Sequence, residues 1–202
     1  MMELVARHRT KFSQLLGCAL ILVFAFSDKK LEHAAPFATG VMFILGCILV
    51  GCAMVGRLWC AQYIAGYKTS TLVTVGPYSV CRNPLYFFSF LGGIGAGLCS
   101  ESLTIIAVIL IVFAAIYPIT IKTEERKLSG IFGEAYSRYS ANVPRFIPDI
   151  SKFREPAEYV VNTKVYRREL VDAMYFLWIV GFFEFLEVLI EAQIIPTYFS
   201  MY

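Results

Sequence analysis

Apolar residues are gathered in long, nearly continuous stretches that alternate with short polar connections. A helix that crosses the hydrocarbon core of a membrane needs about 20 apolar residues, within a range of roughly 17–25. Three stretches reach that length, and the first and third are shorter but can extend into their flanks. The pattern therefore predicts an all-α, polytopic membrane protein with about five transmembrane helices. The predicted segments are residues 12–26, 36–59, 85–99, 103–121 and 171–195.

The first segment has the basic-then-apolar order of a signal peptide, because Arg7, Arg9 and Lys11 precede it or open it. The polar residues 27–30 that follow show no small-x-small cleavage pattern. We therefore interpret the segment as a retained membrane anchor.

The third segment contains the glycine-rich run GGIGAG, in which Gly93 and Gly97 are four residues apart. In an apolar helix this spacing indicates close helix packing, and close approach of a cofactor or lipid tail is the alternative. Only residues 100–102 separate the third and fourth segments. We expect these two segments to form a tight antiparallel hairpin.

The composition agrees with a membrane protein, since 58% of the residues are hydrophobic and only 16% are charged, against about 25% charged in ordinary soluble domains. The six cysteines form no Cys-x-x-Cys pair and mostly lie in apolar runs, where they are expected to pack as small apolar residues. The two histidines lie outside the apolar segments. We expect no disulfide framework and no metal site.

The distribution of basic residues predicts the orientation. With five spans, all of the 18 lysines and arginines except Lys29 and Lys30 fall on one side. The positive-inside rule places that side in the cytoplasm. We therefore expect a multi-pass membrane protein whose N-terminus and long loops, residues 57–84 and 122–170, are cytoplasmic.

The stretch GPYSVCRNPLYFF, residues 76–88, carries polar residues at the entry of the third segment. Pro84 suits the first turn of a helix, and Asn83 is then a natural N-cap. Together with Arg82, the free backbone N–H groups of this turn would attract an anionic group. The alternative is a capped helix with an interfacial arginine and Tyr86 in an aromatic belt.

The stretch KTEERKLSGIFGEAYSRYSANVPRFIP, residues 122–148, follows the fourth segment. Glu124 and Glu125 come at the end of an apolar helix, where anions are disfavoured unless cations compensate. Neighbouring lysines and arginines or a cationic ligand could do so. The apolar spacing of residues 128–139 predicts an amphipathic helix that Gly130 and Gly133 weaken or break. A basic face beside lipid headgroups is the alternative.

These two stretches, separated by a two-helix hairpin, resemble the integral-membrane methyltransferases, which include isoprenylcysteine carboxyl methyltransferases and phospholipid N-methyltransferases. The resemblance covers about residues 70–148. It implies S-adenosylmethionine as the cofactor. It also implies that Tyr136, Tyr139 and Arg145 lie nearer the methyl acceptor as candidate catalytic residues. The residues that would bind the cofactor are Leu72, Val73, Gly76, Tyr78, Arg82, Asn83, Tyr86, Glu124 and Glu125.

One residue departs from the family pattern, because the usual histidine is Asn83 here. An amide keeps a donor and an acceptor but cannot take up a proton. Asn83 is therefore not expected to act as a general base. Methyl transfer from a sulfonium requires alignment and a dry site more than a nucleophile of the protein.

The resemblance favours a prenylcysteine-like carboxylate as the acceptor, with a phospholipid amine or a thiol as alternatives. A sterol-reductase-like enzyme that uses NADPH is another class, but its Arg-His-x-Asn-Tyr pattern is not followed at Arg82–Tyr86. A non-enzymatic membrane scaffold is a third class. Its one supporting feature is a stripe of acidic residues in the last apolar segment, Glu184, Glu187 and Glu191.

We expect three regions: residues 1–56 with the first two apolar helices, residues 57–148 as the catalytic core, and residues 149–202 as a linker and a last helix. The expected partners are membrane lipids and a lipophilic methyl acceptor, and no nucleic acid. The acidic stripe of the last helix would serve contact between copies of the chain, and binding of the acceptor or of a cation is the alternative.

Overall fold

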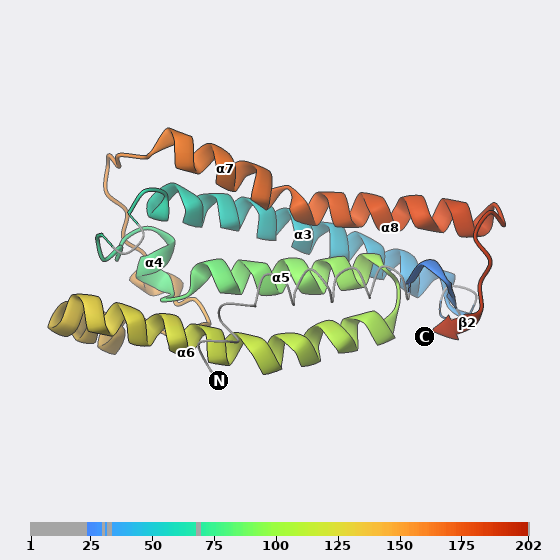
Figure 1. The fold of residues 1–202 in the computed structure, drawn as a ribbon, viewed down its shortest axis with the longest axis horizontal. Coiled ribbons are helices and arrows are strands. Elements are labelled where there is room, and N and C mark those ends of the chain that lie inside the picture. Colours follow the sequence, from blue (N-terminus) through green and yellow to red (C-terminus); the bar gives the residue numbers. More distant parts are fainter. Residues whose placement is uncertain (1–23, 30, 32–33, 68–69, 202) are drawn as a thin grey trace. The chain divides into compact units, whose positions relative to one another are not determined.

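The apolar stretches form helices in the computed structural model, which describes residues 24–29, 31, 34–67 and 70–201 (Figure 1). The predicted all-α fold is confirmed. The two strands in the described part of the chain are three residues long and pair in parallel. The elements in chain order are β1 (Ser27–Lys29), α3 (Pro36–Ile64), α4 (Pro77–Val80), α5 (Pro84–Cys99), α6 (Leu103–Asn142), the 3-10 helix η1 (Ile150–Lys152), α7 (Thr163–Ala173), α8 (Tyr175–Glu191) and β2 (Phe199–Met201).

Three helical stretches are long and apolar enough to cross a membrane: α3, α6 and the stretch 163–191, with α5 as a shorter apolar helix. Only 22%, 17% and 22% of their most apolar windows are buried inside the protein. Apolar side chains that face outward along a whole helix are suited to lipid and not to water. The chain is therefore a polytopic membrane protein. The predicted first segment lies outside the described residues except for residues 24–26, so a fifth span stays a prediction.

Helix α6 joins two elements that the sequence analysis kept apart, the fourth apolar segment and the amphipathic helix after it. The predicted break at Gly133 is confirmed, since its backbone (φ 51°, ψ −122°) leaves the helical region within α6. Gly130 stays helical, so the prediction that both glycines disturb the helix is right for one of them. Positive φ is accessible to glycine at little cost.

The predicted last segment, residues 171–195, is two helices in the structure. Helix α7 begins at Thr163, capped by the side chain of Asn162, which accepts a hydrogen bond from the Val165 N–H at 3.1 Å. It ends at Ala173, and α8 begins at Tyr175. The search for apolar stretches in the sequence did not find α7, because most residues of this helix are polar.

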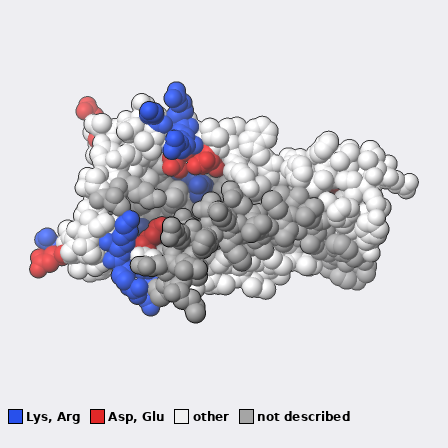
Figure 2. Space-filling model, viewed as in Figure 1, with Lys and Arg blue, Asp and Glu red and all other residues white. Residues whose placement is uncertain are grey.

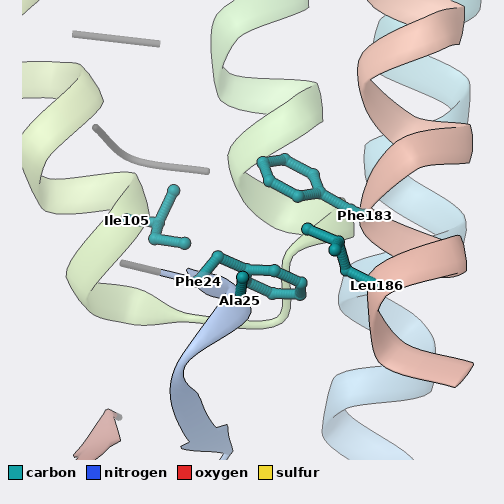
Figure 3. Packing of buried hydrophobic residues seen from close by; sticks show 5 residues of the cluster. All are labelled: Phe24, Ala25, Ile105, Phe183 and Leu186. Atoms are coloured by element: carbon teal, nitrogen blue, oxygen red, sulfur yellow. The ribbon is translucent and has the colours of Figure 1, made fainter. Parts of the chain in front are cut away.

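The described chain divides into two units, and α3, α5 and α6 each contribute to both. Unit 1 comprises the described residues within 24–51, 92–116 and 175–201, and unit 2 comprises those within 52–91 and 117–174. A cluster of buried residues fills part of unit 1, with the rings of Phe24 and Phe183 4.8 Å apart and Ile105 and Leu186 beside them (Figure 3).

Glycines bring helices close together within unit 1, as predicted for the GGIGAG run. A Cβ atom on Gly97 would lie 3.1 Å from the side chain of Ile106, and one on Gly95 would lie 2.8 Å from the carbonyl oxygen of Gly46. Between α5 and α6 the chain turns within three residues, with Glu101 at φ 54°. The predicted tight hairpin is confirmed.

In unit 2 the segment after η1 packs on the last turns of α3. The rings of Trp59 and Phe153 are 5.8 Å apart, and those of Tyr63 and Tyr159 are 4.6 Å apart. The Tyr159 hydroxyl also donates to the carbonyl of Tyr63 at 2.8 Å. These contacts fix the segment that supports the polar site described next. On the face shown in Figure 2, charged side chains gather over the helices that belong to unit 2.

Candidate functional site

Backbone hydrogen bonds join the loop around α4 to the segment that follows α6. The Arg82 N–H donates to the carbonyl of Pro144 at 2.8 Å, and the Asp149 N–H donates to the carbonyl of Val80 at 2.9 Å. The Gly76 N–H donates to the carbonyl of Arg154 at 2.7 Å. Two stretches more than sixty residues apart in sequence are thereby held in one place, as a cofactor site shared by both stretches requires.

A cluster of charged and amide groups lies at this junction, centred on Glu125. Its carboxylate is 3.0 Å from Nε of Arg145 and 3.7 Å from Nη1 of Arg82, and it accepts a hydrogen bond from Nδ2 of Asn83 at 3.0 Å. The Glu125 side chain is only 15% exposed. Protein groups thus compensate its charge, which a largely buried carboxylate requires. We name Arg82, Asn83, Glu125 and Arg145 the Glu125 cluster.

Asn83 links the cluster to the backbone because its amide nitrogen also donates to the carbonyl of Arg145 at 2.9 Å. An NH₂ group supplies two donors at one atom, which a neutral histidine ring cannot. At the predicted N-cap position, the carbonyl of Asn83 accepts from the N–H groups of Tyr86 and Phe87 at 3.1 Å. Asn83 therefore joins the start of α5 to Glu125.

The thiol of Cys81 lies beneath the cluster and is fully buried. It approaches the carbonyl oxygen of Phe146 at 3.1 Å. Burial raises the pKa of Cys81 to about 11, against smaller opposing effects of the Asn83 N–H and Arg82. The thiol is therefore neutral near pH 7 and acts as a packing group with a weak hydrogen bond.

A cavity of about 150 Å³ lies next to the Glu125 cluster within unit 2. Two buried polar atoms of its lining residues, the hydroxyl of Tyr78 and Nε of Arg82, have no hydrogen-bond partner among the described residues. Burial raises the pKa of Tyr78 well above its usual value, so its hydroxyl stays protonated. Unpaired buried donors are costly and point to a ligand. The lining residues are Ile64, Tyr67, Thr71, Leu72, Val73, Tyr78, Arg82, Glu124, Lys127, Leu128 and Tyr139.

The two predicted tyrosines near the acceptor differ in their contacts. The Tyr139 hydroxyl donates to the carbonyl of Tyr78 at 2.7 Å and so fixes the ring that lines the cavity. The Tyr136 ring lies 6.0 Å from that of Tyr139, and its buried hydroxyl has no hydrogen-bond partner in the described part of the chain. The Tyr136 hydroxyl lies near Arg82, and burial raises the pKa of Tyr136 against the opposing effect of that arginine.

The predicted site residues fall into three groups. The cavity is lined by six of them: Leu72, Val73, Tyr78, Arg82, Glu124 and Tyr139. Asn83, Glu125 and Arg145 form the neighbouring cluster with Arg82, and Tyr136 is buried beside Tyr139. Gly76 and Tyr86 lie outside the lining. Gly76, at φ 59°, packs against the ring of Tyr63, and Tyr86 makes an edge contact with Tyr117 at 5.4 Å.

The sequence analysis missed five residues of the lining. Leu128 lies one helical turn after Glu124, so its position on the same face could have been inferred from the spacing. The other four carry no distinctive motif. Two of them, Ile64 and Tyr67, lie beyond residue 59, where the second membrane segment was predicted to end. The missed residues are Ile64, Tyr67, Thr71, Lys127 and Leu128.

Comparison with known proteins identifies the class. The model of the phospholipid methyltransferase family matches residues 37–135, which include the loop around α4, the α5–α6 hairpin and both glutamates. The chain belongs to the integral-membrane methyltransferases of the phospholipid methyltransferase type. The resemblance seen in the sequence is confirmed.

Two curated relatives cover most of the chain. It is 39% identical to the nickel-cobalt-cadmium resistance protein NccN of Alcaligenes xylosoxydans xylosoxydans, over 96% of this chain and 90% of the relative. It is 36% identical to the cobalt-zinc-cadmium resistance protein CzcN of Cupriavidus metallidurans, over 86% of this chain and 79% of the relative. No solved structure gives a significant match.

Proposed function

We propose that the protein is an S-adenosylmethionine-dependent methyltransferase that acts on a lipophilic or amphipathic acceptor. The observation that carries the proposal is the cavity within unit 2. Arg82 and Tyr78 from one stretch and Glu124 from the other line it together, and two of its buried donors have no hydrogen-bond partner among the described residues. The family match over residues 37–135 supports the reaction class.

The lining residues fit the methionyl part of the cofactor. Arg82 would hold the carboxylate, to which its unpaired Nε can donate. Glu124 would face the ammonium group, and the ring of Tyr78 would face the sulfonium by a cation–π contact. The cofactor supplies an activated methyl group. The residues that line the cavity would align it with the acceptor and exclude water.

The size of the cavity limits what it can hold. About 150 Å³ is smaller than the roughly 300–1,000 Å³ of typical small-molecule sites. The cavity would thus hold the methionyl portion, while the adenosyl portion extends beyond it. This assigns the ligand-selective polar contacts to Arg82 and Glu124.

The sequence resemblance and the family model favour different methyl acceptors. A prenylcysteine-like carboxylate is the acceptor that the resemblance of residues 132–148 favours, and a phospholipid amine is favoured by the family model that matches. A thiol is the third candidate. Transfer of a labelled methyl group to each acceptor class in lipid extracts separates them.

Calorimetry in detergent tests the cofactor. We expect S-adenosylmethionine and its demethylated product to bind and NADPH not to bind. Glu124→Gln removes a charge from the cavity lining and should raise the Kd for S-adenosylmethionine about tenfold. Glu134→Gln, which removes the same charge from an exposed position of α6 outside the cavity lining, should leave it unchanged. Binding of NADPH alone, or equal effects of the two substitutions, would contradict the proposal.

The two relatives are named as metal resistance proteins. We infer that this chain contributes to metal resistance by methylating a membrane component. The described residues contain no group of three or more His, Cys, Asp or Glu side chains that could hold a metal ion. Cells that carry Glu124→Gln in place of the native chain should lose resistance to nickel, cobalt or cadmium. Unchanged resistance would separate the two roles.

A further inference from the structure

Unit 2 has a second hollow, which is separate from the candidate cofactor cavity but adjoins it. It is a groove of about 660 Å³, and Tyr139 is the residue that lines both spaces. Its walls come from the end of α6, from α4 and the loop before it, and from the end of η1 and the residues after it. We name it the basic groove and define it by Thr74, Ser79, Arg138, Asn142, Lys152 and Arg154.

Three cations line the basic groove, and the carboxylate that pairs with one of them lies outside the lining. Arg138, Lys152 and Arg154 all face it, and none of the described residues that line it is acidic. The side chains of Arg138 and Arg154 make no hydrogen bond or ion pair with another described residue. Like charges in one hollow repel one another, so this arrangement favours a bound anion.

The third cation is held in position by the protein. Nζ of Lys152 donates to the carbonyl of Asn142 at 2.6 Å and lies 3.5 Å from Oδ2 of Asp149. One of the three charges is therefore partly compensated, and two guanidinium groups remain. Guanidinium groups bind phosphate through paired hydrogen bonds.

The Ser79 side chain, which lines the groove, is held by hydrogen bonds to backbone groups. The hydroxyl of Ser79 accepts from the N–H of Arg154 at 3.0 Å and donates to the carbonyl of Gly76 at 2.7 Å. Arg154 is thus attached to α4, while Arg138 belongs to α6. The two guanidinium groups approach the groove from separate, well-anchored elements.

We propose that the basic groove binds a phosphate monoester, as a site separate from the methyl-transfer cavity. A monoester carries about −1.5 to −2 charges near pH 7, which matches two free guanidinium groups better than a single carboxylate does. The source is either a soluble phosphorylated compound or the headgroup of a lipid with a terminal phosphate. The site does not depend on the proposed methyltransferase activity.

The test uses the full chain. In detergent at low salt, calorimetry measures the binding of inorganic phosphate and glycerol 3-phosphate. In nanodiscs, the thermal stability of the protein is compared in phosphatidylcholine with and without phosphatidic acid. Binding of the soluble phosphates identifies a soluble source, and stabilisation by phosphatidic acid alone identifies a lipid source. If the soluble phosphates do not bind and phosphatidic acid does not stabilise the protein, the proposal is overturned.

Substitutions locate the site. Arg138→Gln and Arg154→Gln should each raise the Kd, or lower the stabilisation by phosphatidic acid, about tenfold. Arg126→Gln is the matched control, because Arg126 is exposed on α6 and lines neither hollow. Equal effects of the three substitutions, or none, would overturn the site. Binding of S-adenosylmethionine should be unchanged in all three, so failure of the groove and failure of the cofactor cavity are distinguishable.

Discussion

The adjacent glutamates of α6 should have different roles, and substitution of each by glutamine tests this. Glu125 is 15% exposed and contacts two arginines and an amide. Glu124 lines the cavity. Glu125→Gln keeps the shape of the side chain but removes the charge that compensates Arg82, whose side chain is 17% exposed. Its main effect should be on stability.

The size of the effect follows from burial. An exposed ion pair contributes about 0–1 kcal/mol, and breaking a fully buried one costs about 3–5 kcal/mol. The partner Arg145 is 47% exposed, so solvent screens that half of the cluster, whereas Arg82 is largely buried. We expect Glu125→Gln to lower the free energy of unfolding by roughly 2–3 kcal/mol. Glu124→Gln should lower it by about 1 kcal/mol or less.

Titration with sodium dodecyl sulfate in mixed micelles measures both values on the purified protein. The matched control is Arg145→Gln, which removes the exposed partner and should cost about 1 kcal/mol. The reasoning is refuted if Glu125→Gln leaves the free energy of unfolding unchanged, or if Glu124→Gln costs as much as Glu125→Gln.

Three further predictions concern packing, hydrogen bonding and pH. Gly46→Ala places a Cβ 2.7 Å from the carbonyl oxygen of Gly95 and should cost about 1–3 kcal/mol. Gly51→Ala on the same helix meets nothing within 4 Å and should be neutral or stabilise by about 1 kcal/mol in the same titration. Asn83→Ala removes both side-chain hydrogen bonds and should cost about 2 kcal/mol; a cost below about 0.5 kcal/mol would contradict the linking role. Because the pKa of Cys81 is raised to about 11 in the folded state, the stability present below pH 9 should fall by about 2–3 kcal/mol as the pH rises to about 11. Cys81→Ser should remove that decrease, and an unchanged pH profile would show that the thiol is not buried.

The sequence predicted features that depend on local pattern. Long apolar runs form transmembrane helices because a helix pairs all of its backbone N–H and C=O groups internally, and lipid offers these groups no hydrogen bonds. Pro84 marked the start of α5, and Gly133 marked a break in α6. The order of two motifs around a hairpin was enough to identify the family.

Only the tertiary structure separated the members of the predicted site. Glu124 and Glu125 are indistinguishable as neighbours in sequence, but successive residues of a helix point about 100° apart. One therefore lines the cavity and the other joins Arg82 and Arg145. The basic groove was also not evident in the sequence, since Arg138 and Arg154 belong to separate segments that backbone hydrogen bonds bring together. The local pattern determined helices and motifs, and side-chain direction and chain contacts decided which charges face a ligand.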